Sequence, residues 1–262
     1  MSSEVERSFD ISNSRRSQRL LDSARNDSCE DTTVCLFSSL HIYHDISPHR
    51  AAMNMAIDEA LLEHATVPSI RFYRWYSPAL SFGYFGKFSD VASFQGDRDV
   101  VRRWTGGGIV FHGDDLTYSI VIPASDAAFS ESSILIYEKI HWFLCDVLIA
   151  NGERAELALV AGVGDAGTAI IDRGHSCFAN PVCADVMIDG RKIAGAAQRR
   201  TRDGLLQQGS IQGIELENRL AERFAEELSN KCEPRTLPQA VHHRAREIAA
   251  RKYATDAWLR KR

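Results

Sequence analysis

The sequence predicts an α+β fold, because stretches with strand periodicity and stretches with helical periodicity both recur along the chain. Residues 69–76 alternate and are rich in aromatic side chains, which indicates a strand. Residues 133–150 carry apolar side chains at helical spacing and end at Asn151 and Gly152, a common helix stop. Residues 189–210 contain Asp-Gly twice, which is typical of a meander of antiparallel strands.

The same patterns predict the remaining elements. Short apolar stretches punctuated by proline or glycine indicate strands, and apolar faces at helical spacing indicate helices. The expected elements are strands over 34–43, 79–85, 116–122 and 154–160, a strand or a loop over 162–171, and helices over 51–65, 215–228 and 238–251.

The helix over 51–65 is expected to begin at Ser47 and Pro48, since serine is a good cap and proline fits the first helical turn. Asp58 and Glu59 in its middle are interpreted as solvent-exposed charges.

Residues 1–33 are predicted to be a disordered tail, and residues 34–262 a single domain. The tail is polar, rich in serine and of mixed charge, and it has no periodic apolar face. It also lacks the apolar core of a secretory signal, so we expect a cytoplasmic protein.

Composition excludes some functions. The net charge is −4, whereas a general nucleic-acid binder usually has a basic face. No apolar run approaches the roughly 20 residues of a membrane span. We therefore expect neither nucleic acid nor a membrane as a partner.

The cysteines do not form the closely spaced pairs that hold metals, so no metal site is expected. In a reducing compartment they are predicted to be free thiols. They are Cys29, Cys35, Cys145, Cys177, Cys183 and Cys232.

Lys192 follows the first Asp-Gly turn and is succeeded by small residues, among them Gly195 and Ala196. Small side chains let a ligand or a neighbouring backbone come close. An amine on a strand beside such a floor is suited to hold a carbonyl or phosphate oxygen.

A second block begins with Arg102 and Arg103, continues through the glycines 106–108 and ends at His112. Gly106, Gly107 and Gly108 expose backbone N–H groups that can cup an anion, and Arg103 adds positive charge. A flexible turn between two strands is the structural alternative. Arg102 is interpreted as a solvated neighbour, and His112 as either a substrate-orienting group or a hydrogen-bonding loop residue.

Together the two blocks resemble the lipoate–protein ligase and octanoyltransferase group of the biotin/lipoate ligase superfamily. That group carries RR-x-[ST]-GG-x-x-V-x-H, followed roughly eighty residues later by G-[RK]-K-[IV]-x-G-[SA]-A. The likeness covers about residues 36–258 of this chain. It implies a mixed, largely antiparallel sheet flanked by helices, as in class II synthetase-like ligase domains.

The resemblance also implies an acyltransferase that moves octanoyl, or lipoyl, from a carrier thioester to the lysine of a lipoyl domain. Cys177, in a Cys-Phe pair, is similar to the acyl-accepting nucleophile of octanoyltransferases from Gram-positive bacteria. Lys192 would lower the pKa of this thiol and stabilise the thioester oxygen. A buried structural thiol is the alternative for Cys177, and Cys183 is its rival as nucleophile.

The implied substrate-binding residues come from three segments. Arg103, the glycines 106–108 and His112 would meet the polar end of the donor, and Gly195 and Ala196 would form the floor. The apolar walls would be supplied by Phe72, Trp75, Phe82 and Tyr84.

The sequence is compatible with three other functions. A lipoate–protein ligase acting through lipoyl-AMP would need ATP and Mg²⁺, whereas the transferase needs no cofactor. A non-catalytic module that binds lipoyl or carrier domains belongs to another class. Biotin ligase fits less well, because its Gly-Arg-Gly-Arg loop is replaced by RRWTGGG.

The expected partners are an acyl carrier protein or lipoyl-domain donor, and apo lipoyl domains of the glycine cleavage H protein or of 2-oxoacid dehydrogenase E2. Because carrier and lipoyl domains are usually acidic, Arg199, Arg200 and Arg202 are either a docking patch or a solvated hairpin face.

Overall fold

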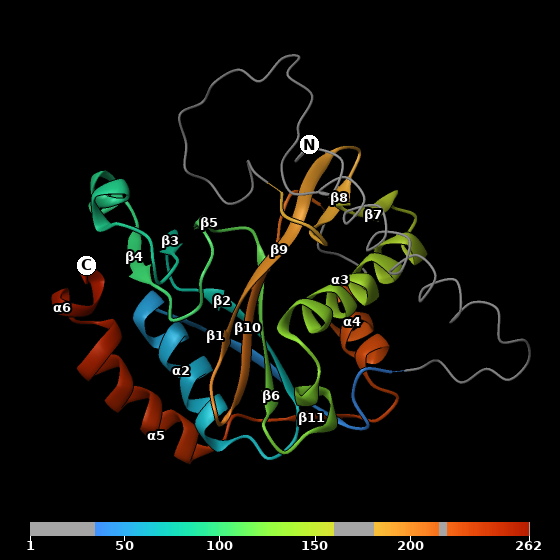
Figure 1. Cartoon of the computed structure of the whole chain (residues 1–262). Coiled ribbons are helices and arrows are strands. Elements are labelled where there is room, and N and C mark those ends of the chain that lie inside the picture. Colours follow the sequence, from blue (N-terminus) through green and yellow to red (C-terminus); the bar gives the residue numbers. More distant parts are fainter. Residues whose placement is uncertain (1–34, 160–180, 215–218, 262) are drawn as a thin grey trace, which may run out of the picture. The chain divides into compact units, whose positions relative to one another are not determined.

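The computed structural model describes residues 35–159, 181–214 and 219–261 (Figure 1). Residues Cys35–Arg262 form one compact unit. The predictions for the tail, for residues 162–171 and for Cys177 lie outside the described residues. None of the helices in the described part of the chain is long and apolar enough to span a bilayer.

The centre of the fold is an eight-stranded sheet with the strand order β11-β1-β2-β6-β10-β9-β8-β7. Strand β1 pairs in parallel with both of its neighbours, and all other neighbouring pairs are antiparallel. The mixed, largely antiparallel sheet is thus confirmed. Its strands are β1 (Leu40–His49), β2 (Ser69–Trp75), β6 (Leu116–Pro123), β7 (Ala155–Leu157), β8 (Val186–Ile188), β9 (Arg191–Arg200), β10 (Gly204–Ile211) and β11 (Cys232–Arg235).

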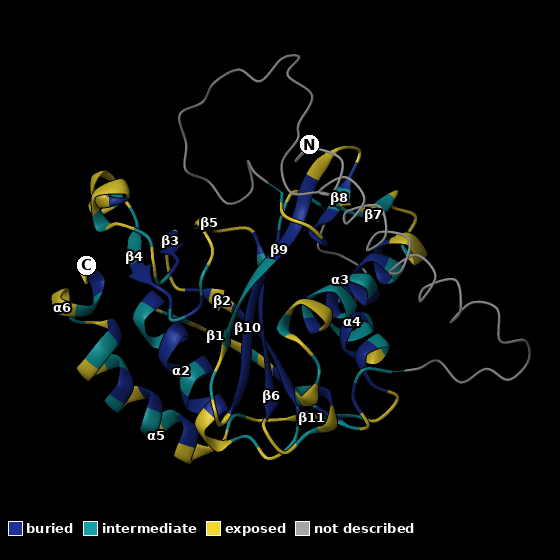
Figure 2. Ribbon diagram, in the orientation of Figure 1, coloured by how far each residue is buried: buried dark blue, intermediate teal, exposed yellow. Residues whose placement is uncertain are grey.

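Helices cover both faces of this sheet (Figure 1). Helices α2 (Ala51–His64) and α5 (Gln239–Ile248) pack on one face, and α3 (Ser133–Ala150) and α4 (Leu220–Leu228) on the other. Alternation along the strands fills both cores: Ile120 and Ile122 contact the α3 side, and Val121 contacts the α2 side. The central strands are consequently buried along most of their length (Figure 2).

A second sheet of three strands was not expected from the sequence. Strand β3 (Ala79–Phe82) pairs in parallel with β4 (Asp99–Arg102) and antiparallel with β5 (Ile109–His112). This sheet places the glycine block in the turn between β4 and β5. Shorter elements complete the fold, namely η1 (Phe88–Asp90), η2 (Ala92–Phe94), η3 (Ala127–Ser130), the π-helical turn η4 (Ala249–Tyr253) and α6 (Asp256–Leu259).

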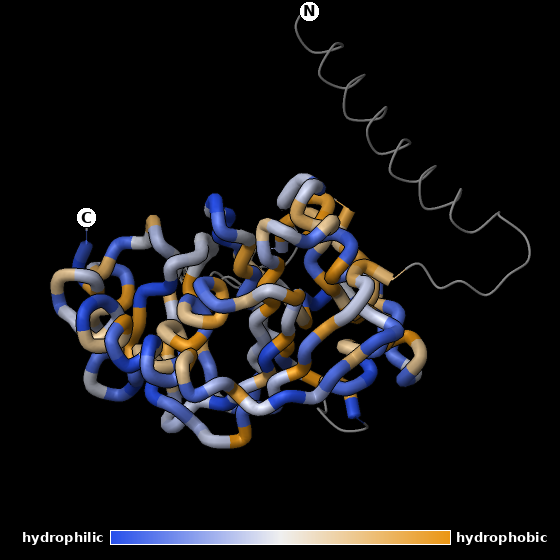
Figure 3. Tube along the Cα trace, turned by 90° about the horizontal axis from the view of Figure 1, so that it is seen from below, coloured by the Kyte–Doolittle hydropathy of each residue, from blue (hydrophilic) through white to orange (hydrophobic). Residues whose placement is uncertain are grey.

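The chain ends in hydrophilic residues after α6 (Figure 3).

The predicted start of the first helix is wrong. Ser47 and Pro48 lie inside β1, which runs through an irregularity between Asp45 and His49 and still pairs His49 with Trp75. Helix α2 begins at Ala51, whose N–H donates to Asp99 Oδ2 at 2.8 Å. The carboxylate that satisfies this helix end therefore comes from β4, far away in the sequence.

Candidate active site

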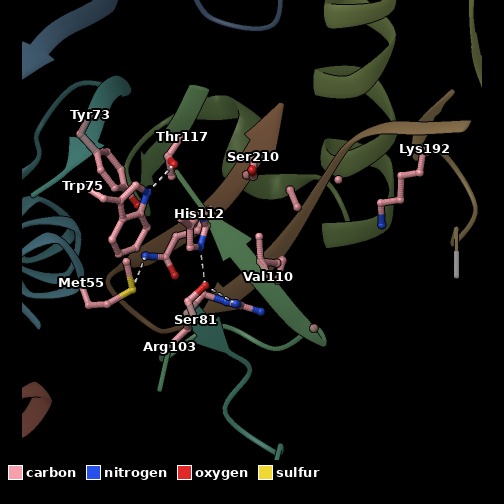
Figure 4. Close-up of a pocket in the computed structure, with 16 residues that line it drawn as sticks. Met55, Tyr73, Trp75, Ser81, Arg103, Val110, His112, Thr117, Lys192 and Ser210 are labelled. Atoms are coloured by element: carbon pink, nitrogen blue, oxygen red, sulfur yellow. Dashed lines mark hydrogen bonds between the residues drawn. The ribbon is translucent and has the colours of Figure 1, made fainter. Parts of the chain in front are cut away.

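A cavity of about 30 Å³ lies where the small sheet, helix α2 and strands β9 and β10 meet (Figure 4). Its lining combines apolar walls, a floor of small residues and two basic side chains. The lining residues are Met55, Tyr73, Trp75, Ser81, Arg103, Gly107, Val110, His112, Thr117, Lys192, Gly195, Ala196, Ala197, Gln208, Gly209 and Ser210.

Lys192 occupies one end of this cavity. Its Nζ lies 2.7 Å from Asp185 Oδ2, and both side chains are almost fully buried. The tight turn before β9 has Asp189 and Gly190 at φ 49° and 75°, as the Asp-Gly signal predicts. Only glycine fits at position 195 with Lys192 in this place, because a Cβ there would stand 2.4 Å from Lys192 Cε.

Asp185 is itself held in place. Its carboxylate accepts hydrogen bonds from Tyr137 Oη at 2.6 Å and from the Val182 N–H at 2.6 Å. Burial, followed by the charge of Asp185, raises the pKa of Tyr137, so this phenol stays protonated and donates. Tyr137 Oη in turn accepts the Ala196 N–H at 3.1 Å. The ammonium group of Lys192 is thereby fixed at the edge of the glycine–alanine floor.

His112 stands at the other side of the cavity. Its Nδ1 lies 2.8 Å from Asp115 Oδ2, its Nε2 lies 2.7 Å from Ser81 Oγ, and its ring stacks on Trp75 at 4.1 Å. Burial lowers the pKa of His112, although Asp115 opposes the shift. The ring is therefore neutral at pH 7, with Nδ1–H donating to Asp115 and Nε2 accepting from Ser81.

Asp115 is the anchor of this arrangement. Burial disfavours its charged form, but hydrogen bonds from His112, Thr117 and Ser210 outweigh it and lower the pKa of Asp115 to about 2. The Gly113 N–H adds a further hydrogen bond at 3.0 Å. A charged Asp115 fixes both the tautomer and the orientation of His112.

Arg103 binds the glycine turn. Its Nη2 donates to the carbonyls of Gly106 and Gly108 at 3.1 and 2.8 Å, and its Nη1 donates to Ser81 Oγ at 2.6 Å. Gly107 adopts φ +80° and lines the cavity. Gly106 and Gly108 have ordinary negative φ angles and are not part of the lining. The block therefore shapes the cavity wall, and Arg103 is the residue that holds it.

Arg102 is not the solvated neighbour that the sequence indicated. It is 1% exposed and donates to five carbonyls, those of Tyr84, Gly86, Trp258, Leu259 and Lys261. Arg102 thus connects the C-terminal segment 258–261 to β4 of the three-stranded sheet.

The expected apolar walls are only partly in place. Trp75 lines the cavity, but Phe72 packs against Phe224 on the opposite side of the sheet, and Phe82 lies in the apolar cluster of the small sheet. The Tyr84 ring lies against Trp258 at a tilt of 52°, with the ring centroids 5.7 Å apart. Phe82 and Phe72 do not line the cavity because the strands turn their side chains into the cores.

Several residues behind the lining were missed by sequence analysis. Asp58 is fully buried, which overturns its interpretation as a solvated charge, and it accepts hydrogen bonds from Arg71, Tyr73, Ser119 and Gln208. These partners are distant in the sequence and carry no local signal. The interpretation of Glu59 as solvent-exposed is also wrong, since its side chain is 12% exposed and pairs with Lys252 at 2.6 Å.

The cysteines of the described part of the chain are free thiols. Cys145 is buried, and burial raises its pKa to about 11, while Cys183 is exposed. In the same described residues, no group of three or more His, Cys, Asp or Glu side chains is arranged to hold a metal ion.

The catalytic domain of lipoyl protein ligases A and B matches residues 50–249. The chain belongs to this family. The matched range contains every residue that lines the cavity. The family inferred from the two sequence blocks is confirmed.

The relatives in this family include octanoyltransferases of Gram-positive bacteria. LipM of Oceanobacillus iheyensis is 39% identical over 175 residues, which cover 63% of this chain and 61% of LipM. LipM of Halalkalibacterium halodurans is 30% identical over 258 residues, which cover 79% of this chain and 94% of that relative. The matched part thus spans about three-fifths of the first relative and most of the second.

Solved structures confirm the fold. A Thermoplasma acidophilum protein assigned as a lipoate protein ligase, with bound lipoic acid, superimposes with a TM-score of 0.65 at 21% identity, covering 84% of this chain and 98% of that chain. A lipoate-protein ligase A bound with ATP gives a TM-score of 0.64 at 18% identity, with 85% and 98% covered. The resemblance implied a mixed sheet flanked by helices, and this is the fold of the structure.

Proposed function

We propose that the protein is an acyltransferase of protein lipoylation, which moves an octanoyl or lipoyl group from a carrier thioester through Cys177 to the lysine of a lipoyl domain. The observation that carries the proposal is Lys192, buried and held by Asp185 at the end of a cavity with a glycine–alanine floor. The LipM relatives support the same reaction.

In the first half-reaction, the Cys177 thiolate attacks the thioester carbonyl carbon. The carbon–sulfur bond to the carrier breaks, and the carrier leaves as a thiol after taking up a proton. The Lys192 ammonium favours the thiolate and stabilises the negative charge that develops on the carbonyl oxygen.

In the second half-reaction, the neutral amine of the acceptor lysine attacks the acyl-cysteine. The amine loses a proton, an amide forms and the Cys177 thiol is released. The donor is an acyl carrier protein or a lipoyl domain, and the acceptor is an apo lipoyl domain of the H protein or E2 type. A bi-partite lipoate protein ligase of T. acidophilum, described together with its E2 lipoyl domain, has the same fold, with a TM-score of 0.60.

The alternative, a lipoate–protein ligase, needs ATP and Mg²⁺. Mg²⁺ is held by carboxylates together with the phosphates of the nucleotide. None of the described side chains that line the cavity is a carboxylate, so no residue is assigned to an adenylation step.

Intact-protein mass spectrometry tests the proposal. Mixing with octanoyl-carrier protein is expected to give an octanoyl adduct that hydroxylamine removes, and to lose it in Cys177→Ala but not in Cys183→Ala. Modification of an apo lipoyl domain from free octanoate and Mg-ATP, unaffected by Cys177→Ala, would identify a ligase instead. Carrier binding without any acyl adduct would identify the binding module.

A further inference from the structure

The cavity is too small for the acyl chain that the proposed function requires. Its volume is about 30 Å³. An apolar cavity that takes up benzene is roughly 150 Å³, and an eight-carbon chain is longer than benzene. At least one side chain in the lining must therefore move when an acyl chain enters.

The aromatic side chains of the lining are fixed. Tyr73 donates from Oη to Asp58 Oδ2 at 3.2 Å, and the Arg71 guanidinium lies over its ring at 4.0 Å. Trp75 donates from Nε1 to Thr117 Oγ1 at 2.8 Å and stacks on His112. Moving either ring breaks a buried hydrogen bond, which is unfavourable.

The polar side chains are fixed as well. Gln208 donates to Asp58 Oδ2 at 2.7 Å and accepts from Thr105 Oγ1 at 2.8 Å. Lys192 is paired with Asp185, and Arg103 and His112 share Ser81. Val110 is β-branched and has restricted rotamers.

Met55 is different from all of these. It is 1% exposed, extends from helix α2, and lies at the end of the cavity away from Lys192 (Figure 4). Its side chain is unbranched with three rotatable bonds, and its sulfur, a weak acceptor, takes a hydrogen bond from Gln208 Nε2 at 3.3 Å. A change of rotamer would break only a weak hydrogen bond to the sulfur, and it would lengthen the cavity at the end away from Lys192.

We propose that Met55 is the movable end wall of the acyl cavity and determines the length of the saturated acyl chain that the protein accepts. This inference rests on the proposed function. With the thioester at Lys192, the tail of the acyl chain runs along Trp75 and Tyr73 and its last carbons meet the Met55 thioether. The fixed groups around the middle of the cavity determine the path of the acyl chain, and Met55 determines how long that chain can be.

Competition among hexanoyl, octanoyl, decanoyl and dodecanoyl carrier thioesters tests this assignment, with the acyl-enzyme masses as readout. Met55→Ala is expected to shift the ratio of dodecanoyl to octanoyl adduct upward by about tenfold or more, the size of effect that one or two methylene groups produce in an apolar pocket. Met55→Leu keeps the volume but is branched, and it should favour hexanoyl over octanoyl. Because each readout is a ratio within one sample, partial unfolding of a variant does not change it.

Met53→Ala is the matched control, since Met53 is a half-buried methionine of the same helix that does not line the cavity. It should leave the ratios as in the unchanged protein. Unaltered ratios in both Met55 variants would overturn the assignment.

Calorimetric binding of free hexanoate, octanoate, decanoate and dodecanoate separates this inference from the proposed function. If no acyl adduct forms in the unchanged protein, acyl transfer is refuted, while the order of affinities in Met55→Ala still decides the role of Met55.

Discussion

At the scale of single residues, the reactive end of the cavity depends on the absence of one side chain. A Cβ on Gly195 would stand 2.6 Å from Lys192 Nζ and 3.0 Å from Asp185 Oδ1. The ion pair between these two residues leaves no room for it. The sequence placed Lys192 beside Gly195 on one strand, but residues three apart on a regular strand face opposite sides. The irregularity where β9 pairs with β8 is what lets the Lys192 side chain lie over Gly195.

We expect Gly195→Ala to displace the Lys192 ammonium and to slow octanoyl-adduct formation by about a hundredfold, the usual effect of losing one group that stabilises a developing oxyanion. The rate is measured by mass spectrometry on mixing with octanoyl-carrier protein. Gly96→Ala is the control, because nothing lies within 4 Å of its added Cβ. Equal rates in the two variants would refute this role for Gly195.

His141 is a second residue whose environment predicts a measurable effect. Burial lowers its pKa to about 4, against the opposing hydrogen bond to the Ala184 carbonyl. In the unfolded chain the same ring titrates near its ordinary pKa of about 6.5. Between these values the unfolded chain binds a proton that the folded protein does not, so stability falls as the pH falls.

The free energy of unfolding should therefore decrease by about 3 kcal/mol between about pH 7 and about pH 4 on account of His141 alone. His112 contributes in the same direction, since burial lowers its pKa too. Urea titrations across this range check the slope. In His141→Phe the slope should be shallower than in the unchanged protein, and identical slopes would contradict the assignment.

At the scale of elements, local signals were sufficient where an element is stabilised locally. The 133–150 helix has its own serine cap, with Ser132 Oγ accepting from the Leu135 N–H, and its bounds were predicted correctly. The start of α2 was missed because its first N–H, that of Ala51, donates to Asp99, which is brought there by the small sheet. That sheet was not predicted because its strands are only four residues long.

Arg102 joins β4 to the C-terminal segment, and its planar guanidinium satisfies carbonyls in two separate stretches of chain. Arg102→Lys is expected to destabilise the protein by roughly 3 kcal/mol, because an ammonium has three donors and cannot match this geometry. Chemical denaturation measures the loss, and limited proteolysis should cut first after α6. Arg202→Lys, in an exposed turn, should change neither readout.

At the scale of the whole molecule, one buried network joins the framework to the cavity. Asp58 of α2 accepts from Arg71 of β2, Ser119 of β6 and Gln208 of β10, so a helix and three strands converge on one carboxylate. Gln208 lines the cavity, and it is oriented by this network. The sequence showed the motifs at the cavity but not this support, because its members are linked only through the tertiary fold.

Removing the carboxylate should therefore affect stability far more than removing an exposed one. Asp58→Ala is expected to cost about 3–5 kcal/mol, because it leaves the fully buried Arg71 short of one of its two carboxylate partners. Glu63→Ala, on the same helix, removes an exposed pair with Arg244 and should cost no more than about 1 kcal/mol. Urea unfolding at pH 7 compares the two.

Asp58→Asn adds a test of what the charge itself contributes. The amide keeps the shape of the side chain and can still accept from Ser119, but it no longer neutralises Arg71. Its stability should fall between those of Asp58→Ala and the unchanged protein. If Asp58→Ala and Asp58→Asn both unfold at the same urea concentration as the unchanged protein, α2 and the three strands are held together by apolar packing alone. The network around Asp58 would then serve only to orient Gln208.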